Sequence, residues 1–403
     1  MELKEDTYLK MEISTRGLCI FLFQCAYIAD VVLGSEPRLY IFSKAITVVF
    51  WGAMILYIAR ELKFKIHTGL GFSIALMFTL YCAMSCLWAV NSDLATSQMN
   101  TQWQLFLLFM FAYILMRETG DIEPYFKAVY FAGFAMLLFA IYRYGVSGFF
   151  QQMLGGSRMG REITNENTFG MAFSQALIMA YYYYLKSRKK IHFASMAIFL
   201  IFALSSGSKK ALLMCIVGVV GLSLFYYGFQ RIWKTVLVAA VVAIVGYFIL
   251  QLPLFSVING RITSYLSGDL NTSDMNRMRF IEYGISLIKE KPIHGWGLQN
   301  FRYVTGTGAY SHNNFIEVFV STGIIGFLIY YSMYLTAGWT VIRRFIQRKE
   351  VTMIVSLILL LISVVFGYGA VQFYSKDTWF FLAVLLATTD ESGGERVYDK
   401  ENL

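Results

Sequence analysis

The chain has 403 residues, of which 57% are hydrophobic and only 15% are charged, and its formal net charge is +9 at pH 7. A soluble globular domain rarely combines so much apolar content with so few charges. The composition therefore excludes an ordinary soluble enzyme. Long apolar runs such as residues 236–250 indicate helices that cross the hydrocarbon core of a bilayer, so we expect an all-α polytopic membrane protein.

Hydropathy predicts about twelve membrane spans. The first apolar run is followed by many others and lacks a small-residue cleavage site, so we expect it to be a span and not a signal peptide. No linker or repeat suggests a separate soluble domain, and we expect a single membrane domain over residues 1–403. The spans are expected near 17–34, 39–59, 68–90, 103–116, 128–145, 169–185, 193–207, 211–230, 235–252, 313–338, 351–370 and 378–389.

Three connections, 60–67, 186–190 and 343–350, are strongly basic. Because short loops rich in Lys and Arg stay in the cytoplasm, we expect these connections and both termini on the cytoplasmic side. The long connection 253–311 then forms an extracytoplasmic loop or lid between the ninth and tenth spans. The segment 146–168 is expected on that same outer face.

An amphipathic helix is predicted within the long loop. Ser273 or Asp274 can cap its start, and Pro292 with Gly295 ends it. Its apolar residues recur at helical spacing, and its more polar side carries three residues that can interact with solvent or with a ligand. The apolar set is Met278, Ile281, Ile285 and Ile288, and the polar set is Arg279, Glu282 and Tyr283.

A group of cations lies away from the three basic connections. Lys209 and Lys210 stand between two apolar runs, and Arg158 and Arg161 come just before the sixth span. A cation in such a position is unfavourable unless it faces a cavity or an anion. Arginine matches phosphate oxygens with two parallel hydrogen bonds, so we infer a pocket for a lipid-linked phosphate or diphosphate. For any single cation, contact with lipid headgroups is the alternative.

The stretch Ser-His-Asn-Asn at 311–314 precedes a predicted helix that begins at Phe315. Ser311 or Asn313 can cap that helix. The helix dipole and nearby arginines both disfavour a charged imidazole, so we expect His312 to be neutral near pH 7 and able to accept a proton from a sugar hydroxyl. On spacing alone, a purely structural role of His312 in the loop is the alternative.

Metal and disulfide chemistry have little support in the sequence. The five cysteines all lie in apolar runs, and the chain has four histidines. Cysteines in such runs behave as small hydrophobic residues. We therefore expect no metal site, no disulfide framework and no cofactor.

The spacing of His312, Asn313, Gly323 and Gly326 resembles the H-[NSQ]-x9-G-x-x-[GTY] signature of the O-antigen ligase and O-antigen polymerase superfamily. The two glycines are also explained by close packing against a neighbouring helix. Four further segments resemble the same superfamily and follow its order: 157–170, 204–213, 279–283 and 291–301.

The resemblance covers roughly residues 157–326 and implies a GT-C-like fold with inverting, metal-independent glycosyl transfer. The implied donor is a glycan on undecaprenyl diphosphate, used at the outer face of the bacterial cytoplasmic membrane. By position, His312 would activate or orient the acceptor hydroxyl, while Arg158 and Arg279 would hold the diphosphate. Lys209 stands where the family has arginine, which weakens two-pronged binding there. Further diphosphate-binding candidates are Arg161, Lys210 and Arg277, and weaker acceptor or sugar contacts are Asn313, Asn314, Glu282 and Tyr283.

Three functions remain open at this level. The first is a polymerase that joins lipid-linked repeat units, the second a ligase that moves finished glycan to lipid A–core, and the third a flippase. A flippase predicts charges along several mid-membrane helices, whereas the charges here gather near one face, with Lys44 and Arg143 as the main exceptions. The expected partners are the lipid-linked donor, a glycan or lipid A–core acceptor, the bilayer and other polysaccharide-assembly proteins, with no nucleic acid.

Overall fold

The structure is a computed structural model that describes residues 14–34, 36–155, 157–228, 231–252, 255–267, 272–348 and 350–389. It is 80% helix, and the described residues contain no strand. The predicted all-α class is therefore confirmed. In chain order the helices are α1 (Thr15–Leu33), α2 (Tyr40–Arg60), α3 (Leu70–Ser85), α4 (Ser92–Thr119), α5 (Glu123–Tyr144), α6 (Val146–Leu154), α7 (Glu166–Ser187), α8 (Lys190–Ser205), α9 (Lys209–Tyr227), α10 (Ile232–Gln251), α11 (Ser256–Leu266), α12 (Thr272–Glu290), α13 (Asn300–Val304), α14 (Asn314–Arg348), α15 (Val351–Phe366) and α16 (Lys376–Thr389).

Six described helices, α1, α2, α4, α5, α9 and α14, are long and apolar enough to cross a membrane, and shorter apolar helices accompany them. The protein is a multi-pass membrane protein, and the count of twelve spans stays a prediction. Helix α4 shows why hydropathy misjudges boundaries. The predicted span 103–116 is the apolar part of a 28-residue helix whose earlier residues include Gln98 and Gln102, both buried inside the bundle.

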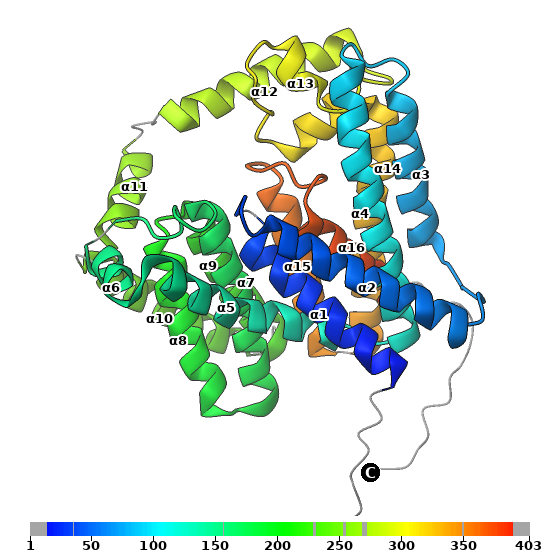
Figure 1. Cartoon of the computed structure of the whole chain (residues 1–403). Helices are drawn as coiled ribbons and strands as arrows, with labels where there is room; N and C mark the ends of the chain where they lie inside the picture. The colour runs from blue at the N-terminus through cyan, green and yellow to red at the C-terminus, as the bar shows by residue number, and fades with distance from the viewer. Residues whose placement is uncertain are drawn as a thin grey trace, which may run out of the picture.

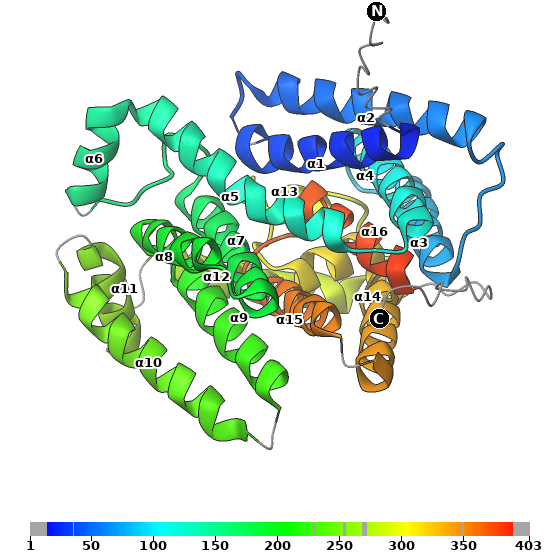
Figure 2. The same ribbon diagram turned by 90° about the horizontal axis from the view of Figure 1, so that it is seen from below.

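The helices form two groups that meet in the middle of the molecule. Helices α3, α4 and α14 lie side by side in one group, and α7, α8 and α9 lie in the other (Figure 1). Helices α1 and α2 pair with each other on one side, and α10 lies at the edge against α9 (Figure 2). Helix α15 contacts both α9 and α14, so it joins the two groups.

The long connection before α14 contains three helices, and α12 and α13 lie across one end of the bundle (Figure 1). We call α12 and α13 the lid. Helix α12 begins at Thr272, so Ser273 and Asp274 fall in its first turn, and the cap position before it lies outside the described residues. Phe280 and Leu287 pack toward α13 and α14. A Cβ at Gly284 would lie 2.1 Å from Ile316 Cγ2, so a glycine is needed for this close approach.

Helix α14 is interrupted at Gly323, which has φ 65° and ψ −170°. In an uninterrupted helix the Ile324 amide would bind the Val320 carbonyl. Instead Ile324 N donates to Pro292 O at 2.9 Å, and Val320 O accepts from Trp296 N at 2.7 Å. The predicted packing glycine thus admits the segment 292–297 to the backbone of α14. Gly326 faces Tyr81 of α3, where a Cβ would lie 3.0 Å from the ring.

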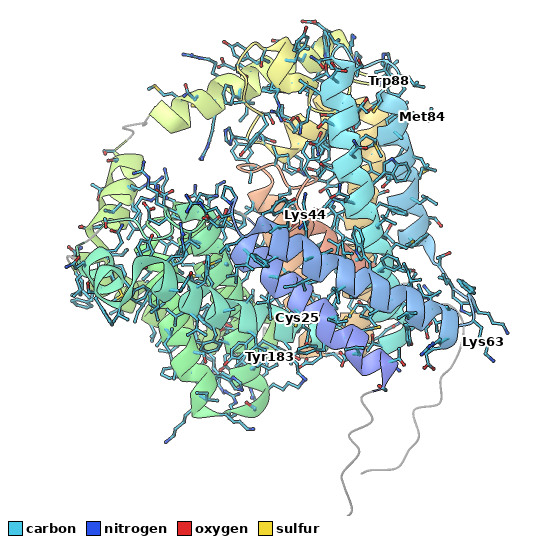
Figure 3. All side chains as sticks on the ribbon, in the orientation of Figure 1. Cys25, Lys44, Lys63, Met84, Trp88 and Tyr183 are labelled. Carbon is cyan, nitrogen blue, oxygen red and sulfur yellow. The ribbon has the colours of Figure 1, made fainter. Side chains whose placement is uncertain are left out.

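The two ends of the bundle differ in character. Trp88, just after α3, lies at the lid end, and Lys63 in the basic connection lies at the opposite end (Figure 3). Trp88 Nε1 donates to the carbonyl of His294 at 2.9 Å, which ties α3 to the segment beneath the lid. Helix α14 likewise begins beside α12, and it continues to Arg348, so most of the predicted basic connection 343–350 is the end of this helix. The cytoplasmic location of that basic end stays a prediction.

Candidate functional site

A cavity of about 690 Å³ lies between α9, α12, α15 and the turn before α14. We call it the main cavity. It brings together residues that are far apart in the sequence, and we call its polar lining residues the polar wall and its apolar lining residues the apolar wall. The polar wall contains Lys209, Lys210, Arg277, Ser311, His312 and Asn313, and the apolar wall contains Leu212, Leu213, Ile216, Ile262, Met278, Ile281, Val365 and Phe366.

The start of α9 places both lysines at the cavity. Gly207 takes the left-handed conformation, with φ 62°, and this turns the chain into the helix. Ser208 then caps α9, its Oγ accepting from Ala211 N at 3.4 Å. Lys209 and Lys210 occupy the first turn, and Lys210 Nζ donates to the carbonyl of Gly369. Because a helix N-terminus carries partial positive charge, the helix adds to the attraction that these lysines exert on an anion.

Two arginines converge on the turn just before α9. Arg158 Nε donates to Ser206 O at 3.0 Å, and Arg261 Nη1 donates to Gly207 O at 3.0 Å. Glu166 lies 3.6 Å from Arg158. Burial and the neighbouring Arg261 guanidinium together hold the pKa of Arg158 below its usual value, and Glu166 opposes this. Arg158 packs against the turn before α9 and is not among the residues that line the main cavity, so its role at the site stays a prediction. Sequence reasoning gave Arg261 no place in the site.

His312 lies half-buried in the turn before α14, with φ 55°. Its ring is nearly parallel to that of Phe280, with 6.0 Å between centroids, and lies 4.3 Å from that of Tyr310. Burial, followed by the charges of Arg277 and Lys210, lowers the pKa of the imidazole. The predicted neutral form is thus supported, although burial contributes more than the charges. Within the described part of the chain the ring nitrogens make no hydrogen bond.

Hydrogen bonds to α14 hold the turn that carries His312. Asn313 caps α14, its Oδ1 accepting from Phe315 N at 2.9 Å and from Ile316 N at 3.1 Å. The buried Glu317 carboxylate accepts from Ser311 N at 2.8 Å. These contacts hold the turn against the start of α14, and the edge of the His312 ring faces the cavity.

Asn314 connects α14 to the segment 367–375, which we call the α15–α16 segment. Asn314 is 1% exposed. Its Oδ1 accepts from Gln372 N at 2.8 Å and from Phe373 N at 3.0 Å, and its Nδ2 donates to Tyr331 at 3.0 Å. Both of its side-chain polar atoms are therefore used inside the protein. The geometry gives this predicted sugar contact a supporting position under the site.

Four other predicted site residues do not line the main cavity. Helix α12 turns Arg277, Met278 and Ile281 toward it, which leaves the opposite side of the helix exposed. Of the predicted apolar set, Ile285 does not line the cavity and is 44% exposed, and Met278 lines the cavity and is still 54% exposed. The residues placed outside the cavity are Arg161, Arg279, Glu282 and Tyr283, all of them exposed.

The arrangement suits an amphiphile with an anionic group. Cations and the starts of two helices line the cavity together with an imidazole of lowered pKa, and apolar side chains complete its lining. Within the described ranges, no group of three or more His, Cys, Asp or Glu side chains lies close enough to hold a metal ion. These features define a multi-pass membrane protein with a cationic, amphiphilic site under a helical lid.

Residues 194–331 match the family model described as O-antigen ligase. The match covers α9, the lid and the start of α14, and hence Lys209, Lys210, Arg277 and His312. The resemblance to the O-antigen ligase and polymerase superfamily is thereby confirmed over this part of the chain, and members of the matched family are membrane glycosyltransferase-like enzymes. No curated protein matches the chain at a significant level.

Proposed function

We propose that the protein transfers a glycan from undecaprenyl diphosphate to a sugar hydroxyl at the outer face of the cytoplasmic membrane, with inversion and without a metal ion. The observation that carries the proposal is the position of His312, whose free imidazole edge shares one cavity with Lys209, Lys210 and Arg277. Base and cations are the two groups that this transfer needs.

The cations of the main cavity would hold the donor diphosphate. Lys209, Lys210 and Arg277 would contact its oxygens, and Arg158 with Arg261 would add positive potential from the neighbouring turn. Arg277 takes the place on α12 that the family pattern suggested for Arg279, because Arg277 lines the cavity and Arg279 is exposed to solvent.

The apolar wall supports a lipid-linked substrate. Leu213 and Ile216 on α9 and Val365 on α15 line the cavity and are also 46%, 39% and 57% exposed. The cavity is therefore continuous with surface that faces the bilayer in a membrane protein. A polyprenyl chain can follow this surface while its diphosphate stays at the cationic wall, since burying each CH₂ group from water contributes about 0.8 kcal/mol.

The chemistry proceeds in one displacement. The acceptor hydroxyl oxygen attacks the anomeric carbon as His312 takes its proton, and the bond from that carbon to the diphosphate oxygen breaks. The electron pair leaves with the diphosphate, and the cations stabilise the charge that develops on it. Because attack occurs opposite the leaving group, the configuration inverts. His312 returns to the neutral form when it releases the proton to water.

Polymerisation of repeat units is the proposed reaction, and ligation of finished glycan is the second candidate because the matching family model is described as O-antigen ligase. Purified protein supplied with lipid-linked repeat units distinguishes them. A ladder of products that each differ by one repeat supports the polymerase. A single transfer that requires lipid A–core supports the ligase. No transfer in either mixture, with lipid-linked glycan moving between leaflets instead, would refute both.

A further inference from the structure

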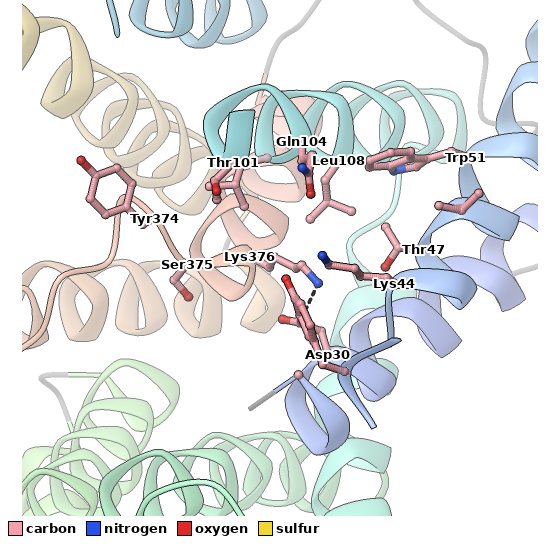
Figure 4. A pocket seen from close by; sticks show the side chains of 14 residues that line it. Asp30, Lys44, Thr47, Trp51, Thr101, Gln104, Leu108, Tyr374, Ser375 and Lys376 are labelled. Carbon is pink, nitrogen blue, oxygen red and sulfur yellow. Dashed lines mark ion pairs between the residues drawn. The ribbon is translucent and has the colours of Figure 1, made fainter. Parts of the chain in front are cut away.

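A second cavity, of about 560 Å³, lies between α1, α2, α4 and the start of α16. Its size is typical of a small-ligand site. Its walls carry hydroxyl, amide and aromatic groups together with three charges, and Figure 4 shows these side chains converging from separate elements. None of the residues that line it has a role in the transfer chemistry described above.

The charges of this second cavity leave one cation uncompensated. Lys376 Nζ lies 2.9 Å from Asp30 Oδ1, and both side chains are largely buried. Lys44 has no carboxylate within ion-pair distance in the described ranges, and its Nζ lies over the Tyr40 ring at 4.5 Å. Lys376 Nζ lies over the same ring at 5.2 Å. Two ammonium groups that face each other beside one carboxylate (Figure 4) attract one further negative charge.

The neutral groups around the cations suit a sugar. Thr101 and Gln104 of α4 line the wall opposite the lysines, and Ser375 adds a hydroxyl. Such groups donate and accept hydrogen bonds, as a polyhydroxylated ligand requires. Trp51 provides a flat aromatic face against which the apolar face of a sugar ring can pack.

The second cavity adjoins the main cavity through the α15–α16 segment. Gly369 lines the main cavity and Ser375 lines the second one, and six residues span at most about 20 Å. Asn314, two residues after His312, holds the middle of this segment through Gln372 and Phe373. The two cavities therefore lie at the two ends of one short segment, which is bound to the start of α14 next to His312.

We propose that the second cavity binds an acidic sugar of the acceptor glycan, with its carboxylate between Lys44 and Lys376. A carboxylate matches the single uncompensated positive charge, whereas a diphosphate needs the larger set of cations found at the main cavity. This inference rests on the proposed glycosyl transfer and adds the substrate class, a glycan that contains uronic acid or a similar carboxylate-bearing sugar.

The test uses the full-length protein in detergent and oligosaccharides of glucuronic, galacturonic and mannuronic acid. Each is paired with the same oligosaccharide after its carboxylates are reduced to alcohols. We expect the protein to bind at least one acidic probe about tenfold more tightly than its reduced counterpart, as one hydrogen-bonded charge pair allows. Lys44→Gln should remove this preference, and Lys44→Arg should keep it.

Lys44 is exposed, so these variants should fold, and saturation-transfer NMR measures binding without catalysis. Equal binding of both members of every pair, binding of none of the acidic probes, or a preference that survives Lys44→Gln would overturn the inference. His312→Ala serves as the matched control, because it should lose transfer while keeping the preference. If His312→Ala transfers glycan at the wild-type rate, the proposed function fails instead.

Discussion

Gly323→Ala tests the break in α14 that brings the segment 292–297 against the helix. At this position φ is 65° and ψ is −170°, a region that only glycine adopts readily and that costs other residues about 1–3 kcal/mol. The new Cβ would also lie 2.1 Å from Ile293 O and 2.3 Å from Ile293 C. Both are backbone atoms that cannot rotate away, and overpacking of this kind costs about 1–3 kcal/mol more. We therefore expect a destabilisation of about 2–6 kcal/mol.

The measurement is thermal unfolding of the purified protein in detergent, with Gly52→Ala as the matched control. Gly52 lies inside α2, and a Cβ added there would have no neighbouring atom within 4 Å, so alanine should leave stability unchanged or raise it slightly. Gly323→Ala should unfold at a clearly lower temperature than either wild type or Gly52→Ala. A Gly323→Ala variant as stable as Gly52→Ala would show that the break in α14 is not needed.

Three further predictions concern the site. Arg277→Gln should slow transfer by about 10- to 100-fold, the effect of losing one charged hydrogen bond. Arg279→Gln should stay near the wild-type rate. If a transfer assay shows that Arg279→Gln is the slower variant, the placement of α12 is contradicted. Because the pKa of His312 is lowered, activity should fall only as the pH drops below about 6.5. Removing the Arg277 charge should raise that pKa and move the acid limb of the pH–rate profile to higher pH. An unchanged acid limb in Arg277→Gln would count against His312 as the base. Asn314→Ala should lower the unfolding temperature more than Asn313→Ala. It removes the acceptor of two amides of the α15–α16 segment and also the donor to Tyr331, and each such hydrogen bond contributes about 1 kcal/mol, whereas loss of the Asn313 cap costs about 1 kcal/mol in all. Equal effects would refute the supporting role of Asn314.

Local patterns in the sequence predict much of this fold. Apolar runs predict helices, and Asn313 is a good cap because its short side chain reaches the first amides of α14. Periodicity alone does not fix how a helix rotates about its axis when both faces hold charged and apolar residues. On α12 the family pattern favoured Arg279, but the contacts of Phe280 and Gly284 with neighbouring elements turn Arg277 to the cavity.

Long-range contacts account for what the sequence does not reveal. Lys44 and Lys376 are separated by most of the chain, and no local pattern indicates that they share a cavity. Arg261 lies on α11, and its contact with Gly207 depends on where this helix packs, so it follows from tertiary structure. The sequence also does not predict the left-handed backbone at His312, because the hydrogen bonds of Glu317, Ser311 and the Asn313 cap impose it.

The central claim is that His312 is the base for glycan transfer, and the most direct measurement is the initial rate of transfer from a defined lipid-linked glycan by wild type and His312→Ala. General-base catalysis contributes about 10²- to 10⁴-fold, so the variant should lose at least about 100-fold while its unfolding temperature stays near that of wild type. A folded His312→Ala variant that transfers glycan at the wild-type rate would contradict the account.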